Sequence, residues 1–356
     1  MTVTGIAGCT ALMVAAFGLR DSMIDIARTQ FEEILRYDVA LNFSLKEEAV
    51  PKPPPGTRLR RWLPIHSESA VLSPGTDTKG LNVSLMVPQN PEALEEYITL
   101  RDRKTRLPLR FSAASVVLTE KLAETWGLKP GDRVVLENAA GRRGSFTISG
   151  ITENYVGAAV YLGPTVYTQE LGGPLVYQTL FAYTDRAGAL QDDLMADLLS
   201  HKEVSSVEFI PQVQASYTKL LDSIGFVVLV LIFAAGGLAM IVLYNLTNIN
   251  ITERTREIAT LRVLGFHQAE AAAYIFREIT LLSIIGAGVG LVLGIPLHRF
   301  IIGVAENADL MFGRRIAPLS FGLSAALTLV FSGGVDLIML KKLGHITLAD
   351  SLKAPD

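Results

Sequence analysis

Cysteine is almost absent from this sequence: Cys9 is the only one among 356 residues. An intrachain disulfide and a multi-cysteine metal site are therefore excluded. Charge is also scarce, at 19% of residues, against about 25% in an average soluble protein. The formal net charge of −3 gives no reason to expect nucleic-acid binding. Any domain outside a membrane must be held by its own apolar core.

Motifs of catalysis are missing too. The sequence has no Walker loop, zinc-protease motif or arrangement of paired carboxylates. His66 and His201 have no partner at metal-ligand spacing, and Ser112, Ser115 and Ser145 lack the context of a nucleophile elbow. We therefore expect no enzymatic activity and no metal site in this chain.

Long uncharged stretches are what the sequence does contain. A helix needs roughly 20 apolar residues to cross the hydrocarbon core of a bilayer. Four stretches lack Asp, Glu, Lys and Arg for about that length, and they are residues 1–19, 223–252, 279–297 and 316–335. A soluble protein with buried core helices is the alternative, but three such stretches fall in the last third of the chain. The pattern predicts four transmembrane helices.

The first stretch has other interpretations. It lacks the basic residues that precede the apolar run of a signal peptide, although Ile6-Ala7-Gly8-Cys9 resembles a lipoprotein cleavage box. The apolar run continues past Cys9 to Leu19, which a cleaved lipoprotein signal does not need, so a spanning helix is favoured. Its abrupt start leads us to expect a fragment, or a chain without its natural cytoplasmic leader.

Basic residues near the spans predict the orientation, because Lys and Arg favour short cytoplasmic loops. The connection between the second and third spans and the C-terminal tail carry seven of them, whereas the loop between the third and fourth spans carries three. The two sets are Arg254, Arg256, Arg262, Arg277, Lys341, Lys342 and Lys353, and Arg299, Arg314 and Arg315. The N-terminus and tail are predicted inside, and residues 20–222 outside.

The predicted fold class is a four-helix membrane bundle with an α+β extracytoplasmic domain between the first and second spans. Residues 20–39 continue the first span as an amphipathic stalk helix. Further expected helices are 118–127, closed by Gly127, and 189–199; expected strands are 133–137, 145–151, 160–162, 180–183 and 204–210. Residues 154–169 are expected as strand and turn. The predicted transmembrane helices are 1–19, 223–246, 271–302 and 316–340. Between and after them are the extracytoplasmic stalk and domain 20–222, the cytoplasmic connection 247–270, the short external loop 303–315 and the cytoplasmic tail 341–356.

The charged connection between the second and third spans, residues 253–265, is called the elbow below. Asn250 followed by Glu253 resembles a capping box, and Gly265 suits the closing position of a helix. Ile258, Leu261 and Leu264 would share one face of the short helix between them. Such a helix could dock in a groove on a partner protein or could be an interfacial connector with no partner, and periodicity leaves both open.

The third span repeats glycine every four residues, at Gly286, Gly290 and Gly294. Small residues at this spacing allow close approach of helix backbones in lipid. Glu278, at the start of this span, is either a functional intramembrane carboxylate or an interfacial anchor. Asp336 in the fourth span is expected to reach toward the cytoplasmic headgroups.

The elbow also resembles a known family. Glu253-Arg254-Thr255-Arg256-Glu257-Ile258-Ala259-Thr260-Leu261-Arg262-Val263-Leu264-Gly265 is similar to the signature of FtsX-like permeases, Glu-Arg-x-x-Glu-Ile-x-x-Leu-(Arg or Lys)-x-Leu-Gly. The glycine-rich third span and the tail at residues 346–353 are similar to the segments that follow it there. MacB-like members share the predicted arrangement, which is one span, a large external domain and three more spans. Residues 18–22 and Tyr37-Asp38 resemble the C-terminal half of large Gram-positive permeases.

The resemblance implies the permease subunit of an ATP-binding cassette (ABC) system in the bacterial cytoplasmic membrane. This chain would bind no cofactor, since ATP-Mg would be held by a separate ATPase. The elbow would be a coupling helix, whose docking residues would be Glu253, Arg254, Glu257, Ile258, Leu261, Arg262 and Gly265. A second permease copy or half and an extracytoplasmic protein are the other implied partners. Asp336 departs from the family pattern, in which an uncharged residue is expected.

Three functions remain in competition. The first is a permease that exports or extracts a hydrophobic or peptide-like substrate by mechanical transmission. The second is a signalling protein that transports nothing and activates an external partner such as a cell-wall hydrolase. The third is an ectodomain receptor anchored by helices. Loss of a bound ATPase on Glu257→Lys would separate the first two from the third.

Overall fold

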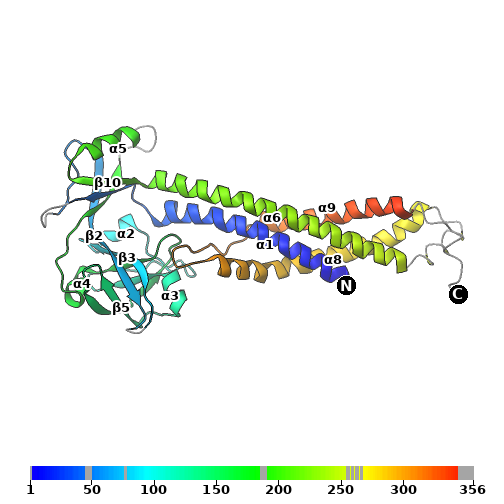
Figure 1. Cartoon of the computed structure of the whole chain (residues 1–356), viewed down its shortest axis with the longest axis horizontal. Helices are drawn as coiled ribbons and strands as arrows, with labels where there is room; N and C mark the ends of the chain where they lie inside the picture. Colours follow the sequence, from blue (N-terminus) through cyan, green and yellow to red (C-terminus); the bar gives the residue numbers. More distant parts are fainter. Residues whose placement is uncertain are drawn as a thin grey trace. The chain divides into compact units, whose positions relative to one another are not determined.

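The computed structural model describes residues 2–44, 50–75, 78–184, 191–253, 257, 260, 264 and 268–343. The chain divides into two compact units, which are described separately here (Figure 1). The first, called the membrane unit, comprises Met1–Met23, Leu221–Ala305 and Arg314–Asp356. The second, called the sheet domain, comprises Ile24–Leu220 and Glu306–Gly313.

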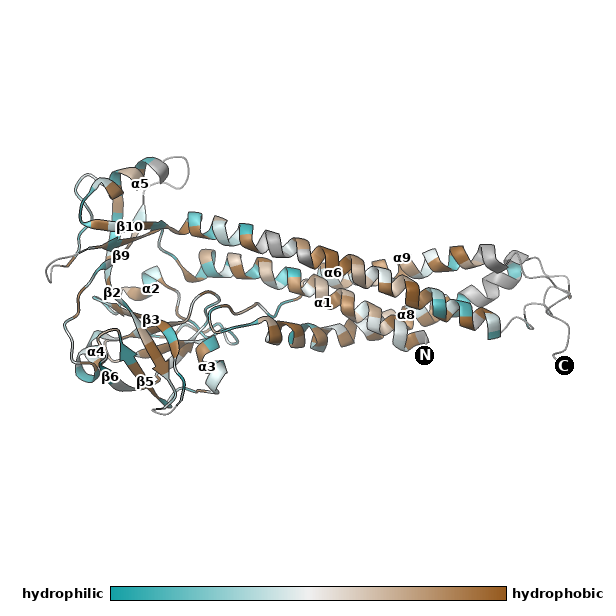
Figure 2. Cartoon of the chain, in the orientation of Figure 1, coloured by the Kyte–Doolittle hydropathy of each residue, from teal (hydrophilic) through white to brown (hydrophobic). Residues whose placement is uncertain are grey.

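Long apolar helices make up the membrane unit. They are α1 (Thr2–Arg28), α6 (Ile210–Glu253), α8 (Gln268–Ala305) and α9 (Pro318–Leu343). Within the described residues, four stretches are long and apolar enough to cross a membrane: Val3–Ile34, Val228–Glu253, Arg277–Ala305 and Pro318–Met339. Figure 2 shows the apolar residues along these helices. The shortest stretch has 22 residues and is about 33 Å long at 1.5 Å per residue, enough for a hydrocarbon core of about 30 Å. The predicted fold class is confirmed.

The capping box expected at Asn250 and Glu253 is wrong, because helix α6 continues through these residues. This helix runs unbroken from Ile210 to Glu253, so Asn250 lies inside the helix and does not cap a new one. Polar side chains near its end are satisfied within the same helix: the Thr252 hydroxyl donates to the Asn248 carbonyl at 2.8 Å. A hydroxyl that bonds back by four residues is compatible with a continuing helix, so the polar run does not end it.

Among the residues that the structure describes, the sheet domain is built on ten strands in one sheet. The strands are β1 (Val39–Phe43), β2 (Leu59–Ser73), β3 (Leu81–Pro88), β4 (Val116–Thr119), β5 (Arg133–Asn138), β6 (Arg143–Thr147), β7 (Gly150–Thr152), β8 (Ala159–Leu162), β9 (Thr179–Thr184) and β10 (Val204–Phe209). The order is β10-β1-β9-β2-β3-β8-β4-β7, with β5 paired to β2 and β6. Short helices accompany them: the π-helix η1 (Thr29–Ile34), α2 (Leu94–Tyr97), α3 (Glu120–Trp126), α4 (Pro164–Glu170) and α5 (Gln191–Ser200).

Strand β2 joins the two apolar cores of this domain. Its first half pairs with β9, its second half with β3, and its last residues also with β5. Leu59, at its start, packs in one core with Val39, Leu41 and Phe209. Leu72, at its end, packs in the other core with residues such as Phe146. One strand of 15 residues therefore contributes side chains to both cores.

Several predicted elements of this domain are confirmed. Residues 133–137, 160–162, 180–183 and 204–209 are strands, and residues 191–199 are helical. Residues 189 and 190 of that predicted helix lie outside the described residues. Gly127 closes α3 with φ 66°, a left-handed conformation that glycine adopts without steric cost.

Other predicted elements are wrong. Residues 118 and 119 belong to β4, and the helix begins only at Glu120. Residues 145–151 are two strands, because the Ser149 hydroxyl and amide both bond to the Val116 carbonyl and break the run between β6 and β7. Residues 154–169 contain α4, which begins with Pro164 at its first turn, a favoured place for proline. The helix expected to residue 39 ends earlier, as η1 gives way to an extended Leu35.

Candidate functional site

The elbow is described only in part. Glu253, at the end of α6, and Glu257 are both exposed. Leu264 is 71% exposed, and its amide donates to the Thr260 carbonyl at 3.0 Å. The remaining predicted coupling residues, Arg254, Ile258, Leu261, Arg262 and Gly265, lie outside the described residues. Both carboxylates of the predicted coupling residues are thus exposed.

The repeated glycines of α8 lie directly against α1. A Cβ atom added at Gly286 would be 2.9 Å from Ile6 Cβ, one at Gly290 would be 2.5 Å from Thr10 Cβ, and one at Gly294 would be 2.5 Å from Val14 Cβ. At Gly290 the Ala7 carbonyl oxygen would also be within 2.6 Å. No side chain fits in such spaces, so the two backbones approach as closely as the small residues permit.

Neutral hydrogen bonds between side chains link the same helices. The Thr10 and Thr328 hydroxyls lie 3.0 Å apart, between α1 and α9, and those of Ser283 and Ser332 lie 2.7 Å apart, between α8 and α9. All four residues are buried. A buried hydroxyl needs such a partner, since water cannot replace it in an apolar bundle.

The C-terminal turns of α1 carry a polar cluster that sequence reasoning missed. Asp21 Oδ2 accepts bonds from the Ala317 amide at 2.9 Å and from the Ser320 hydroxyl at 2.6 Å. It therefore caps the N-terminus of α9 from another helix, where a carboxylate suits the helix dipole. Ser22 Oγ lies 3.2 Å from His298 Nε2 on α8. His298 is 1% exposed, and a Cβ at Gly18 would lie 2.6 Å from its ring, so glycine is required there.

In the sheet domain, residues 153–157 form a junction that we call the joint. The Gln30 side chain, from η1, donates to Asn154 Oδ1 at 3.0 Å and accepts the Tyr155 amide at 2.8 Å. Gln30 and Asn154 are both buried. Because η1 follows α1 without interruption, these bonds tie the end of the first long helix to the joint. π-Helical turns are rare and often mark functional positions.

An ionic cluster reinforces the joint. Arg101 bonds Glu153 at 2.5 Å and Glu33, from η1, at 2.6 Å, while Arg106 lies 3.3 Å from both carboxylates. The Glu153 side chain is fully buried and also accepts the Tyr155 hydroxyl at 2.6 Å. Burial opposes the charge on Arg101, but its bonds to the two carboxylates outweigh this and raise its pKa. Burial, with the bond to Glu153, raises the pKa of Tyr155.

The segment between α8 and α9 is also bonded to the joint. Residues 306–313 belong to the sheet domain, where Leu310 forms an antiparallel bridge with Val156. The Gly157 amide donates to the Asp309 carbonyl at 2.8 Å, and the Met311 amide to the Tyr155 carbonyl at 3.0 Å. The loop that was expected only as a short external connection is thus part of the domain.

An ion pair fixes the start of that segment. Lys121 Nζ, on α3, lies 2.6 Å from Glu306 Oε2. The Glu306 side chain is 1% exposed, and its other oxygen accepts the Phe312 amide at 3.1 Å. A buried carboxylate needs such compensation, so the pair holds residues 306–313 in place against the joint.

The structure also places other candidates that the sequence offered. His66 is buried, with Nδ1 2.7 Å from the Val176 carbonyl and Nε2 3.2 Å from the Tyr167 hydroxyl. Among the described residues, no group of three or more His, Cys, Asp or Glu side chains could hold a metal ion. Asp336 is half-buried, and its Oδ1 is enclosed without a hydrogen-bond partner in the part of the chain that the structure describes.

Most of the joint gave no signal in the sequence, because its partners are far apart in the chain. One signal was available: Gln30 falls on the apolar stripe of the helix after the first span, where a polar residue requires a buried partner. Asp21 and Ser22 follow Arg20, the first charged residue after the uncharged run 1–19. This marks the end of the apolar span but not their partners on α8 and α9.

Comparison with known proteins assigns the C-terminal part of the chain. Residues 220–348 match the family model described as FtsX-like permease C-terminal. An uncharacterized ABC transporter permease protein of Mycobacterium tuberculosis is 25% identical over 202 residues. That match covers 54% of this chain and 23% of the relative, so the chain spans about a quarter of the relative's length.

Solved structures similar to this chain include a periplasmic region and an extracellular domain. The periplasmic region of MacB from Actinobacillus actinomycetemcomitans has a TM-score of 0.33 and 12% identity, over 55% of this chain and 96% of that one. The extracellular domain of the noncanonic ABC-type transporter YknZ from Gram-positive bacteria has a TM-score of 0.29 and 12% identity, over 48% and 98%. The family match over residues 220–348 confirms the resemblance of the elbow and its flanking spans. Residues 220–348 are therefore similar to the C-terminal part of FtsX-like permeases, in a chain whose described residues include four helices long and apolar enough to cross a membrane.

Proposed function

We propose that the chain is the membrane-spanning subunit of an ABC transporter in the bacterial cytoplasmic membrane. A separate ATPase binds at the elbow, on the cytoplasmic side, and residues 20–222 lie outside. ATP hydrolysis in the partner moves the spans, and mechanical transmission through the chain drives export or extraction of a hydrophobic or peptide-like substrate.

The observation that carries the proposal is the FtsX-like match, which includes the elbow and the spans on both sides of it. The exposure of Glu253 and Glu257 supports docking there, since an exposed carboxylate can pair with basic groups of a partner. In the resemblance these residues belong to a coupling helix, and Glu257 is the position at which charge reversal is the most direct test.

The joint supports the mechanical part of the proposal. The first helix reaches it through Gln30 and Glu33, and the segment between α8 and α9 reaches it through Asp309 and Leu310. A movement at the end of α1 is therefore passed to a site where the segment between the last two helices is also bonded. Rigid, hydrogen-bonded connections of this kind are what transmits displacement between distant parts of a protein.

The test is affinity purification of the full-length tagged chain from its native membranes. We expect an ATP-binding cassette protein to co-purify with ATPase activity, and Glu257→Lys to abolish both. Glu170→Lys makes the same charge change at an exposed position of α4 and serves as the control. An ATPase that stays bound to the Glu257→Lys variant would contradict docking at the elbow.

A second experiment, on the wild-type complex, distinguishes the transport proposal from the signalling alternative. Transport predicts that a hydrophobic peptide raises ATP turnover in nanodiscs. If no such substrate stimulates turnover, and a cell-wall hydrolase binds residues 20–222 instead, the transport proposal fails and the signalling alternative replaces it.

A further inference from the structure

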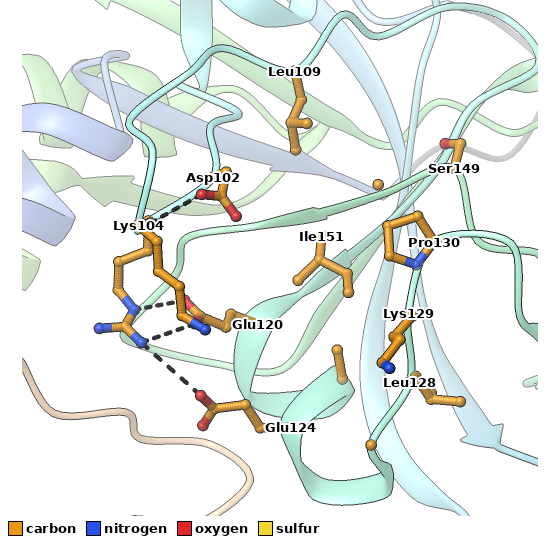
Figure 3. Close-up of a pocket in the computed structure, with 14 residues that line it drawn as sticks. Asp102, Lys104, Leu109, Glu120, Glu124, Leu128, Lys129, Pro130, Ser149 and Ile151 are labelled. Carbon is orange, nitrogen blue, oxygen red and sulfur yellow. Dashed lines mark hydrogen bonds and ion pairs between the residues drawn. The ribbon is translucent and has the colours of Figure 1, made fainter.

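The sheet domain has a pocket that the proposed function does not use. Its volume is about 400 Å³, and it lies between α3, the turn that follows it, the segment 102–109 and the start of β7 (Figure 3). Leu109, Leu128 and Ile151 line it with partly exposed side chains. Leu128 and Ile151 also pack against the larger apolar core. The volume lies in the range of small-molecule sites, about 300–1,000 Å³.

The carboxylates that line the pocket are already bonded. Both oxygens of Glu120 accept from Arg103, at 2.7 and 2.9 Å, and Glu124 lies 3.9 Å from the same guanidinium. Asp102 Oδ1 accepts from the Thr105 amide and hydroxyl and from the Lys104 amide, at 2.7–3.0 Å. The bond to Glu120 raises the pKa of Arg103, and the bonds from Thr105 lower the pKa of Asp102. These groups stay charged and satisfied without a ligand.

The two lysines that line the pocket differ from these bonded carboxylates and from Arg103. Lys104 and Lys129 are exposed, and in the described part of the chain neither ammonium group forms a hydrogen bond or lies within ion-pair distance of a carboxylate. Figure 3 shows Lys129 across the pocket from Glu120 and Glu124. The formal charges of the lining sum to zero, but the groups left without a partner are donors, and they flank an apolar floor.

We propose that this pocket binds a small amphiphile with an apolar body and an anionic head. The body lies on Leu109, Leu128 and Ile151, and the head, a phosphate or a carboxylate, pairs with Lys104 and Lys129. Apolar surface removed from water supplies most of the binding free energy, and the ammonium groups select the sign of the head. The site goes beyond the proposed function, since binding requires neither an ATPase nor movement of the spans.

The test uses the full chain in phosphatidylcholine nanodiscs without ATPase. Trp126 directly precedes the pocket residue Gly127, and Trp62 is the only other tryptophan, so Trp62→Phe leaves one fluorescent reporter beside the site. We expect octyl phosphate or octanoate to change Trp126 fluorescence saturably, and the stronger of the two identifies the head group. Inorganic phosphate and octyltrimethylammonium should bind at least tenfold more weakly. Raised salt should weaken binding, because exposed charges are screened.

Charge reversal provides the decisive comparison. Lys104→Glu with Lys129→Glu should weaken anion binding at least tenfold, whereas Lys52→Glu with Lys202→Glu reverses two exposed lysines outside the pocket and should leave it unchanged. Equal binding of the cationic amphiphile, equal loss in both double variants, or no saturable change with either anion would overturn the proposal. None of these outcomes bears on docking of the ATPase at the elbow.

Discussion

The contacts within the membrane unit differ in kind from the contacts within the sheet domain. In the membrane unit, three glycines of α8 bring its backbone against α1, and neutral hydroxyl pairs link the helices. In the sheet domain, a buried carboxylate, Glu153, is bonded to two arginines. Close backbone packing and neutral hydrogen bonds are therefore prominent in the first unit, and a buried ion pair is prominent in the second.

This difference follows from the solvent of each unit. Charged groups are costly in lipid, so close packing and neutral hydrogen bonds must define how the helices fit. Outside lipid, paired charges can be buried when hydrogen bonds compensate them. The sheet domain should therefore be more sensitive to pH than the membrane unit, and the membrane unit should be more sensitive to steric substitution.

High pH should destabilise the sheet domain more strongly than the membrane unit. Burial raises the pKa of Tyr97 and of Tyr167 to about 12, whereas an unfolded tyrosine has a pKa of about 10. Their contribution to stability is complete below pH 10 and is lost as pH rises through about 12. We expect tyrosinate absorbance to appear in one cooperative step with loss of the sheet, while helical circular dichroism persists. Gradual ionisation near pH 10 with the sheet intact would contradict this.

Glu153→Gln should have the next largest effect. It removes the charge of a fully buried side chain that pairs with Arg101 and Arg106, and breaking a buried pair costs about 3 kcal/mol. The measurement is chemical denaturation of the full chain, followed by Trp126 fluorescence in a Trp62→Phe background. Glu137→Gln, in the exposed pair with Arg143, is the control, with a cost of less than about 1 kcal/mol. Equal costs would show that burial of the joint is not what matters.

Gly290→Val should have a smaller effect, confined to the membrane unit. A Cβ there would collide with Thr10 and with the Ala7 carbonyl, and overpacking of this kind costs about 2 kcal/mol. Thermal unfolding in detergent measures the loss. Gly288→Val is a matched control, because nothing lies within 4 Å of a Cβ at that position of the same helix. If both variants lose the same stability, helix propensity rather than contact with α1 explains it.

The membrane helices could be predicted because the apolar composition of a segment directly determines how favourably it partitions into lipid. The glycine spacing likewise indicated a contact surface on α8, although not that α1 would occupy it. The end of α6 was mispredicted, because Asn250 and Glu253 fit a local capping pattern that the continuing helix overrides. Local patterns are weak evidence where a helix extends for other reasons.

Long-range pairing was beyond the sequence. Strand β2 was not predicted, because its alternation is interrupted: the register shifts between Arg60 and Trp62, and Arg61 has a φ of 39°. A bulge of this kind turns consecutive side chains to solvent and hides the period of two. The joint was missed for a related reason, since Gln30 and Asn154 are 124 residues apart and neither carries a motif.

The bonds of residues 306–313 to the joint impose an order on biosynthesis. This segment follows α8 in the chain, so Glu306 and Leu310 leave the ribosome on the order of ten seconds after β10 and the rest of the sheet. Until this segment has been synthesised, Lys121 has no Glu306 to pair with, and Val156 has no bridge to Leu310. The sheet domain therefore reaches its final form only after the long helix α8 and the segment that follows it have been synthesised.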